Sequence, residues 1–205
     1  NEERKAQKER QNIKKMVRVA INGFGRIGRL VLKAGLNEKS IEFVAINDLS
    51  DAKTLAHLFK YDSVHGKFNG TVEIKDGSIL INKKPIKVIA EKDPLKLPWK
   101  DLNIDIVVES TGIYRSKEEV SKHITAGAKK VILSAPPVDK KVKTICLGIN
   151  DSISTDKDII ISNASCTTNS AAPLIKVLNE TWGLKEAYIT TVHSYTGDQR
   201  LLDAP

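Results

Sequence analysis

The sequence predicts an α/β fold with a doubly wound, mostly parallel sheet, an antiparallel insertion at one edge and the start of a second, α+β domain. Short β-rich apolar runs alternate with helical patterns over most of the 205 residues, which is typical of successive β-α-β units. A glycine-rich turn at residues 23–28 joins the first apolar run to the first helical pattern. Between residues 61 and 98 the helical patterns give way to a hairpin signal, which predicts the antiparallel insertion.

The composition is that of a globular protein, with 40% hydrophobic and 28% charged residues. No apolar run approaches the roughly 20 residues of a membrane span, and the basic extension 1–15 lacks the apolar segment of a signal peptide. Because two cysteines form no disulfide framework, we expect a cytoplasmic protein. The net charge of +8 comes without an RNA-binding aromatic platform or a helix-turn-helix, so we expect no nucleic-acid partner. His57 and His65 lack metal-ligand spacing, so no metal site is expected.

The first β-α-β unit carries a phosphate-binding pattern. Residues 16–22 predict a buried strand and residues 29–36 a helix, with Gly23, Gly25 and Gly28 between them as G-x-G-x-x-G. The first glycine allows a tight turn, the second lets a pyrophosphate approach the backbone, and the third lets helix and strand pack closely. The phosphates would rest on the helix N-terminus. This context predicts a Rossmann-type dinucleotide-binding domain.

The second predicted strand, residues 41–47, ends at Asp48, which lies 20 residues beyond Gly28. A carboxylate at this distance accepts a hydrogen bond from the ribose 2′-hydroxyl of NAD and repels the 2′-phosphate of NADP. The alternative is a turn or N-cap aspartate before the predicted helix 51–60. The spacing favours NAD as the cofactor.

The insertion begins with the polar loop 61–70. Residues 71–82 alternate around Lys75-Asp76-Gly77-Ser78, which predicts a hairpin, and residues 84–89 predict a further edge strand. The sheet therefore gains antiparallel strands on one side only.

The parallel pattern returns at residues 104–109. Ligands bind at the carboxyl ends of strands in doubly wound sheets, so Thr111 and Gly112 are expected to contact the cofactor. His123 stands among lysines and glutamates on the next helix and is expected at the surface, whereas Cys146 alternates with apolar neighbours and is expected to be buried and inert. Further elements are predicted at residues 117–126, at 130–133 with Ser134 after it, at 143–149 and at 158–161.

Cys166 stands where an apolar strand gives way to an apolar-periodic helix, residues 166–183. Ser165 before it is a capping residue, so the thiol is expected in the first helical turn, where unpaired N–H groups and the helix dipole favour a thiolate. A strand predicted at residues 185–192 delivers His193. A lone cysteine is usually structural, and so is a lone histidine; together they form the nucleophile-and-base arrangement.

Several stretches in this order closely resemble the phosphorylating glyceraldehyde-3-phosphate dehydrogenases of glycolysis, over residues 16–205. The most specific are S-N-A-S-C-T-T-N around Cys166 and the H-S-Y-T that begins at His193. The others are V-A-I-N-G-F-G-R-I-G-R, Y-D-S-V-H-G, S-T-G and S-A-P.

The resemblance implies NAD-dependent oxidative phosphorylation of glyceraldehyde 3-phosphate to 1,3-bisphosphoglycerate, in a homotetramer. It implies that Cys166 is the nucleophile, forming a thiohemiacetal and then a thioester, and that His193 is the general base. Ser165 and Thr167 would contact the attacking inorganic phosphate, and Thr196 the phosphate of the substrate. The residues implied to line the NAD site are Gly23, Phe24, Gly25, Arg26, Ile27, Asp48, Thr111 and Ser134.

The sequence departs from the family pattern in three places. Ser170 stands where family members often carry a second cysteine, and Ala204-Pro205 mixes the residues of NAD-specific and NADP-using relatives. The family's chain also continues past Pro205. We therefore expect a basic extension at 1–15, an NAD-binding domain at 16–164 and an incomplete catalytic domain at 165–205, with the apolar faces of 166–183 and 185–192 uncovered.

Two alternatives to this function stay open. One is a dehydrogenase of another phosphorylated aldehyde, such as erythrose 4-phosphate. The other is a catalytically incomplete fragment that binds NAD, or binds polyanions through residues 1–15. Semialdehyde dehydrogenases share the plan of a nucleotide fold followed by a cysteine, but the stretches around Cys166 and His193 speak against them.

Overall fold

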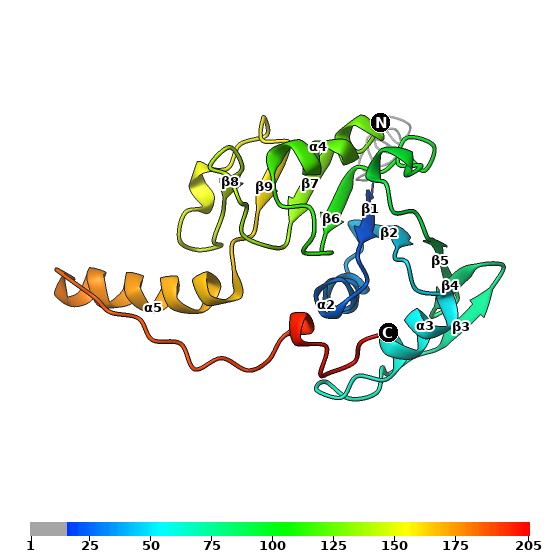
Figure 1. The fold of residues 1–205 in the computed structure, drawn as a ribbon, viewed down its shortest axis with the longest axis horizontal. Helices are drawn as coiled ribbons and strands as arrows, with labels where there is room; N and C mark the ends of the chain where they lie inside the picture. The colour runs from blue at the N-terminus through cyan, green and yellow to red at the C-terminus, as the bar shows by residue number, and fades with distance from the viewer. Residues whose placement is uncertain (1–15) are drawn as a thin grey trace, which may run out of the picture.

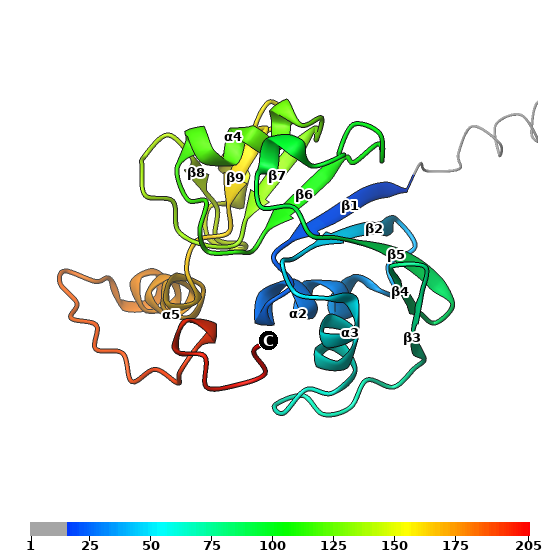
Figure 2. The same cartoon turned by 45° about the vertical axis from the view of Figure 1, so that its right-hand side comes forward.

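The computed structural model describes residues 16–205, and the basic extension 1–15 lies outside them. The described strands form one 9-stranded sheet in the order β3-β4-β5-β2-β1-β6-β7-β9-β8 (Figures 1 and 2). The strands are β1 (Val17–Asn22), β2 (Ile41–Asn47), β3 (Val72–Lys75), β4 (Ser78–Ile81), β5 (Lys84–Ile89), β6 (Ile106–Glu109), β7 (Lys130–Leu133), β8 (Lys143–Thr144) and β9 (Ile160–Ser162). The α-helices are α2 (Arg26–Gly35), α3 (Ala52–Lys60), α4 (Lys117–Thr125) and α5 (Cys166–Trp182).

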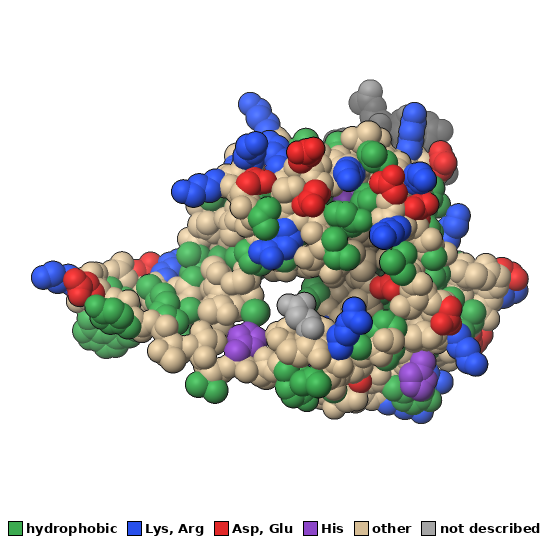
Figure 3. All heavy atoms as spheres, in the orientation of Figure 1, with side chains coloured by type: hydrophobic (Ala, Val, Ile, Leu, Met, Phe, Trp, Pro, Cys, Tyr) green, Lys and Arg blue, Asp and Glu red, His purple; other side chains and the backbone are tan. Residues whose placement is uncertain are grey.

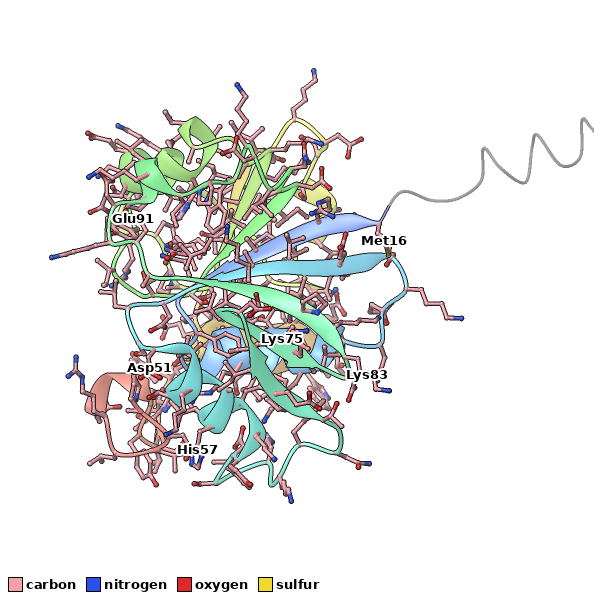
Figure 4. All side chains as sticks on the ribbon, turned by 90° about the vertical axis from the view of Figure 1, so that its right-hand side faces the viewer. Met16, Asp51, His57, Lys75, Lys83 and Glu91 are labelled. Carbon is pink, nitrogen blue, oxygen red and sulfur yellow. The ribbon has the colours of Figure 1, made fainter. Side chains whose placement is uncertain are left out.

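The sheet is parallel from β5 to β8, and only β3, β4 and β5 pair antiparallel, as the insertion predicts. The β3–β4 hairpin turns at Asp76 and Gly77, both with positive φ of 49° and 71°, which matches the twist of the flanking strands. Figure 4 shows Met16 before the amino-terminal end of β1 and Asp51 beyond the carboxyl end of β2, so the two residues lie at opposite ends of the parallel strands.

Two hydrophobic clusters cover the two faces of the sheet. On one face, Ile21 of β1 packs with Leu32 of α2 and Phe59 of α3. On the other face, Ala20 of β1 packs with Val120 of α4. Neighbouring side chains of a strand point to opposite faces, so β1 contributes to both clusters. Because α2 and α4 lie on opposite faces while β1 and β6 are neighbours, the strand order reverses between them, and this is where doubly wound sheets bind ligands.

The predicted bounds of the first helix and of the strand at 143–149 are corrected. Helix α2 begins at Arg26, three residues earlier than predicted, because Gly25 is already the extended N-cap residue. The strand predicted at 143–149 ends at Thr144, because the backbone N–H of Cys146 donates to Asn150 Oδ1 and the chain turns locally. Cys146 is buried, as predicted.

His123 is a further correction, because it is fully buried rather than at the surface. Its ring packs on the inner side of α4, where Trp99 Nε1 donates to Nδ1 at 3.0 Å and Nε2 lies 2.9 Å from Glu109 Oε2. The sequence around it is charged because its helical neighbours face solvent.

The segment 185–192 is not a strand, which corrects the prediction. None of the described strands lies beside it, so its backbone has no ladder to join. Helix α5 has no buried residue, and Leu174, Val177 and Trp182 on it are 65%, 59% and 75% exposed. The apolar faces are therefore uncovered, as expected, and Figure 3 shows hydrophobic side chains on the projecting arm that α5 forms. Within residues 16–205 no helix has the length and apolar content to cross a membrane.

Candidate active site

The glycine turn is sterically tight at its first and third glycines and open at the second. Gly23 has a φ of +90°, and a Cβ on it would lie 2.7 Å from the backbone nitrogen of Thr111. A Cβ on Gly28 would lie 2.2 Å from the carbonyl oxygen of Gly23. A Cβ on Gly25 would meet no atom within 4 Å, so the space in front of this residue is free for a ligand to approach the backbone.

The N-terminus of α2 suits a phosphate group. Gly25 supplies no side-chain cap and the first turn holds no acidic residue, so the first N–H groups of the helix have no side-chain acceptor. Asp48 Oδ2 accepts from the N–H of Phe24 at 2.8 Å and Oδ1 from Ser50 at 2.9 Å. Asp48 therefore acts as a turn residue, and it also ties the end of β2 to the glycine turn. Its contact with the ribose of NAD stays a prediction.

The other expected cofactor residues follow strands at the same edge. Thr111 and Gly112 follow β6 after one residue, Ser110, and Ser134 comes directly after β7, where its N–H donates to the carbonyl oxygen of Glu109 at 2.9 Å. Ile27 on the first turn of α2 is 49% exposed. The structure thus brings the expected NAD residues together at the carboxyl edge of the sheet, around the point where the strand order reverses.

Arg26 is held by two carboxylates that the sequence did not single out. Its Nη1 lies 3.0 Å from Asp62 Oδ1 and 2.9 Å from Asp203 Oδ2. Burial raises the pKa of Asp62, but donation from the N–H of His65 and from Lys33 and Arg26 outweighs it and holds the pKa well below its ordinary value. Asp203 also accepts from the N–H and hydroxyl of Ser63, so the C-terminal segment crosses back to α2 and α3 (Figures 1 and 2).

Cys166 and His193 meet, although they are 27 residues apart in sequence. Cys166 is the first residue of α5, directly after Ser165, the N-cap. The Cys166 sulfur lies 3.2 Å from His193 Nε2, and His193 Nδ1 lies 2.6 Å from the carbonyl oxygen of Ser194. The carbonyl can only accept, so Nδ1 carries a proton and Nε2 faces the sulfur.

The environment of this pair favours a thiolate and an imidazolium. The hydrogen bond with His193 lowers the pKa of Cys166, burial opposes this shift, and the N–H and hydroxyl of Thr167 lower the pKa further. Donation to the Ser194 carbonyl raises the pKa of His193, and the contact with Cys166 adds to it. Both shifts favour the charged form of the pair, in which the sulfur is the nucleophilic thiolate.

The expected phosphate-binding residues are only partly gathered around the sulfur. Thr167 lines a cavity of about 460 Å³ together with Cys166 and His193. Ser165 is engaged as the cap, accepting from the N–H of Thr168 at 3.0 Å. Thr196 does not line the cavity; it caps the 3-10 turn Gly197–Gln199, where its N–H and hydroxyl bond to Gln199. Among residues 16–205, no group of three or more His, Cys, Asp or Glu is placed to hold a metal ion.

Comparison with known proteins decides the family. Residues 17–117 match the family model described as glyceraldehyde 3-phosphate dehydrogenase, NAD binding domain, and residues 165–205 match the C-terminal domain of the same enzyme family. The chain belongs to the glyceraldehyde-3-phosphate dehydrogenase family. It is 57% identical over 192 residues to the enzyme of that name from Thermotoga maritima, 56% over 191 residues to that from Mycoplasma pneumoniae and 53% over 190 residues to that from Clostridium pasteurianum.

These alignments cover 93% of this chain and 57% of each relative. The chain thus spans little more than half the length of the curated relatives it matches. The family confirms the predicted resemblance, the α/β fold and NAD as the cofactor.

Proposed function

We propose that this chain carries the NAD site, the nucleophile and the general base of a phosphorylating glyceraldehyde-3-phosphate dehydrogenase. The observation that supports this most strongly is the 3.2 Å contact between the Cys166 sulfur and His193 Nε2 at the start of α5. In this proposal residues 16–164 bind NAD and residues 165–205 begin the catalytic domain, with Ala164, at a φ of +61°, where the chain leaves β9 for α5.

The residues at the carboxyl edge fit the cofactor. Gly25 leaves open space for the pyrophosphate, the start of α2 offers N–H groups to it, and Asp48 stands where the ribose is expected. Thr111, Gly112 and Ser134 would line the same site. When bound there, NAD would supply the hydride acceptor of the oxidation.

The chemistry of the chain's own residues begins with the Cys166 thiolate. Its attack on an aldehyde carbonyl forms a carbon–sulfur bond and leaves a negative oxygen, which the Cys166 N–H and the protonated His193 can stabilise. His193 donates its proton to this oxygen, which gives a hydroxyl and a neutral imidazole. The imidazole takes the proton back as a hydride leaves the carbon and the thioester forms, and NAD held at the expected site would accept that hydride. Attack by inorganic phosphate on the thioester carbonyl breaks the carbon–sulfur bond, releases an acyl phosphate and returns the thiolate. Ser165 and Thr167 would hold the attacking phosphate, and Thr196 the phosphate of the substrate.

We further propose that the protein works in the cytoplasm as a homotetramer, as its resemblance to the family implies. Light scattering of the purified protein tests the assembly. A monomer at micromolar concentration would contradict that part of the proposal and leave the chemistry of Cys166 and His193 unaffected.

The test of the function is Cys166→Ser in the native polypeptide. We expect the variant to bind NAD as the wild type does and to lose phosphate-dependent NADH formation from glyceraldehyde 3-phosphate. A general base typically contributes about 10²–10⁴-fold, and loss of the nucleophile should remove at least as much. Substantial dehydrogenase activity in the variant would refute Cys166 as the nucleophile, and equal turnover of erythrose 4-phosphate by the wild type would refute the substrate.

A further inference from the structure

The last residues of three neighbouring strands form a buried polar line beneath the expected cofactor site. Asn47 of β2, Asn22 of β1 and Glu109 of β6 are paired in register, and they are 5%, 2% and 0% exposed. Asn47 Nδ2 donates to Asn22 Oδ1 at 2.7 Å, and Asn22 Nδ2 donates to Glu109 Oε2 at 2.6 Å. The proposed chemistry uses none of these side chains.

The hydrogen bonds along this line have a fixed donor-to-acceptor direction, because the group at each end, the N–H of Glu91 or the indole N–H of Trp99, can only donate. The backbone N–H of Glu91 donates to Asn47 Oδ1, which fixes the orientation of the Asn47 amide and, through it, that of Asn22. At the other end, the indole N–H of Trp99 donates to His123 Nδ1, so the proton of His123 is on Nε2 and points to Glu109.

Glu109 is the acceptor in which all these bonds end. Its Oε2 accepts from Asn22 and His123, and its Oε1 accepts from the N–H of Thr111 at 2.8 Å and from the Thr111 hydroxyl. Asn22, His123 and the N–H of Thr111 can only donate in this arrangement, so the side chain of Glu109 serves as an acceptor of neutral donors, with no Lys or Arg among these partners. A fully buried acceptor of this kind is held only by a complete set of hydrogen bonds.

We propose that Glu109 is a positioning residue for NAD binding. It joins the two sides of the crevice: on one side it holds Thr111, and on the other it holds Asn22, the residue before the glycine turn. Ser110 reinforces this link, since its hydroxyl lies 2.7 Å from the carbonyl oxygen of Gly23. The inference rests on the proposed NAD site and adds a residue that lies beneath the cofactor without touching it.

Glu109→Gln tests the proposal because it keeps the volume and changes the hydrogen bonds. Its amide must turn two N–H donors either toward Asn22 and His123 or toward Thr111, and each side already presents donors. We expect NAD to bind about tenfold more weakly, as for the loss of one hydrogen bond to a charged group. The matched control is Glu42→Gln at the amino-terminal edge, where Glu42 pairs with Arg18, and it should bind NAD as the wild type does.

The measurement is calorimetric titration of the whole chain with NAD, below the temperature at which either variant starts to unfold. A Glu109→Gln protein that melts earlier but binds NAD with wild-type affinity has lost only stability, which overturns the positioning role. A wild type that binds no NAD overturns the proposed function and this inference with it, so the two failures are distinguishable.

Rescue provides an independent check. In Asn22→Asp/Glu109→Gln the new amide donates to position 22 and still accepts from Thr111, and only its contact with the N–H of His123 is left donor to donor, so part of the affinity should return; a double variant as weak as Glu109→Gln overturns the hydrogen-bond explanation. If Glu109→Gln does not fold, Thr111→Val replaces it, since Thr111 is only partly buried and Val exchanges its hydroxyl for a methyl group. Thr111→Val with unchanged affinity, compared with Thr111→Ser, overturns the proposal.

Discussion

Gly28→Ala and Gly25→Ala should show separately what the glycine turn contributes to stability and what it contributes to NAD affinity. A Cβ at Gly28 would lie 2.2 Å from the Gly23 carbonyl oxygen and 3.0 Å from Ile21 Cγ2. The first distance is roughly 1 Å shorter than a close carbon–oxygen contact of about 3.3 Å, so the start of α2 must move away from β1. Overpacking of this kind typically destabilises a protein by about 1–3 kcal/mol.

For a chain of this size, such a loss lowers the melting temperature by roughly 2–10 °C. Gly25 differs because its φ of −70° is open to alanine and no atom lies near the new methyl group. The poorer N-cap and the lower entropy of the unfolded chain nearly cancel, leaving stability within about 0.5 kcal/mol. The methyl group would nevertheless stand where the pyrophosphate approaches, so we expect at least a tenfold loss of NAD affinity, about 1.4 kcal/mol.

Thermal unfolding followed by circular dichroism and calorimetric titration with NAD measure the two effects separately. Gly28→Ala should lower the melting temperature and weaken binding, whereas Gly25→Ala should weaken binding alone. A Gly28→Ala protein with wild-type stability would refute the steric argument. A Gly25→Ala protein with wild-type NAD affinity would refute the placement of the phosphates.

Two further predictions concern charged groups. His193→Gln removes the partner that lowers the pKa of Cys166, so the pH midpoint of Cys166 alkylation by iodoacetamide should rise toward that of a free thiol. Cys146 is buried and should stay unreactive throughout. An unchanged midpoint would show that His193 does not activate the thiol. Asp62→Asn removes a carboxylate that accepts from Arg26 and Lys33, and should destabilise the protein by about 2 kcal/mol at neutral pH. Because the pKa of Asp62 is lower in the folded than in the unfolded chain, this stabilisation is present above the ordinary carboxyl pKa and is lost as the pH falls through the pKa of the folded state. A difference in denaturation midpoint between wild type and Asp62→Asn that stays constant with pH would contradict this.

Local patterns were sufficient for the nucleotide-binding half of the chain. Alternation of apolar runs, the glycine spacing and the turn residues at Asp76-Gly77 act over a few residues, so they predict strands, helices and the hairpin directly. The same holds for the start of α5, where Ser165 caps the helix that Cys166 begins. The pairing of Cys166 with His193 was predicted from the two residue types and from the resemblance, and the fold supplied the distance between them.

Tertiary structure decided the features that depend on distant partners. Residues 185–192 have the composition of a strand, but a strand exists only where another strand takes up its hydrogen bonds, and none of the described strands lies there. His123 has charged neighbours in sequence, yet its burial depends on Trp99 and Glu109, which other elements bring to the inner side of α4. Asn47, Asn22 and Glu109 look like ordinary polar residues at strand ends, and only the parallel register aligns them into one buried line. The sequence by itself determined most of the helices and strands of the nucleotide-binding part and the candidate site residues, because those signals are local. The tertiary structure decided whether a strand found a partner and which polar groups are buried together, because both depend on the packed sheet and not on any one segment.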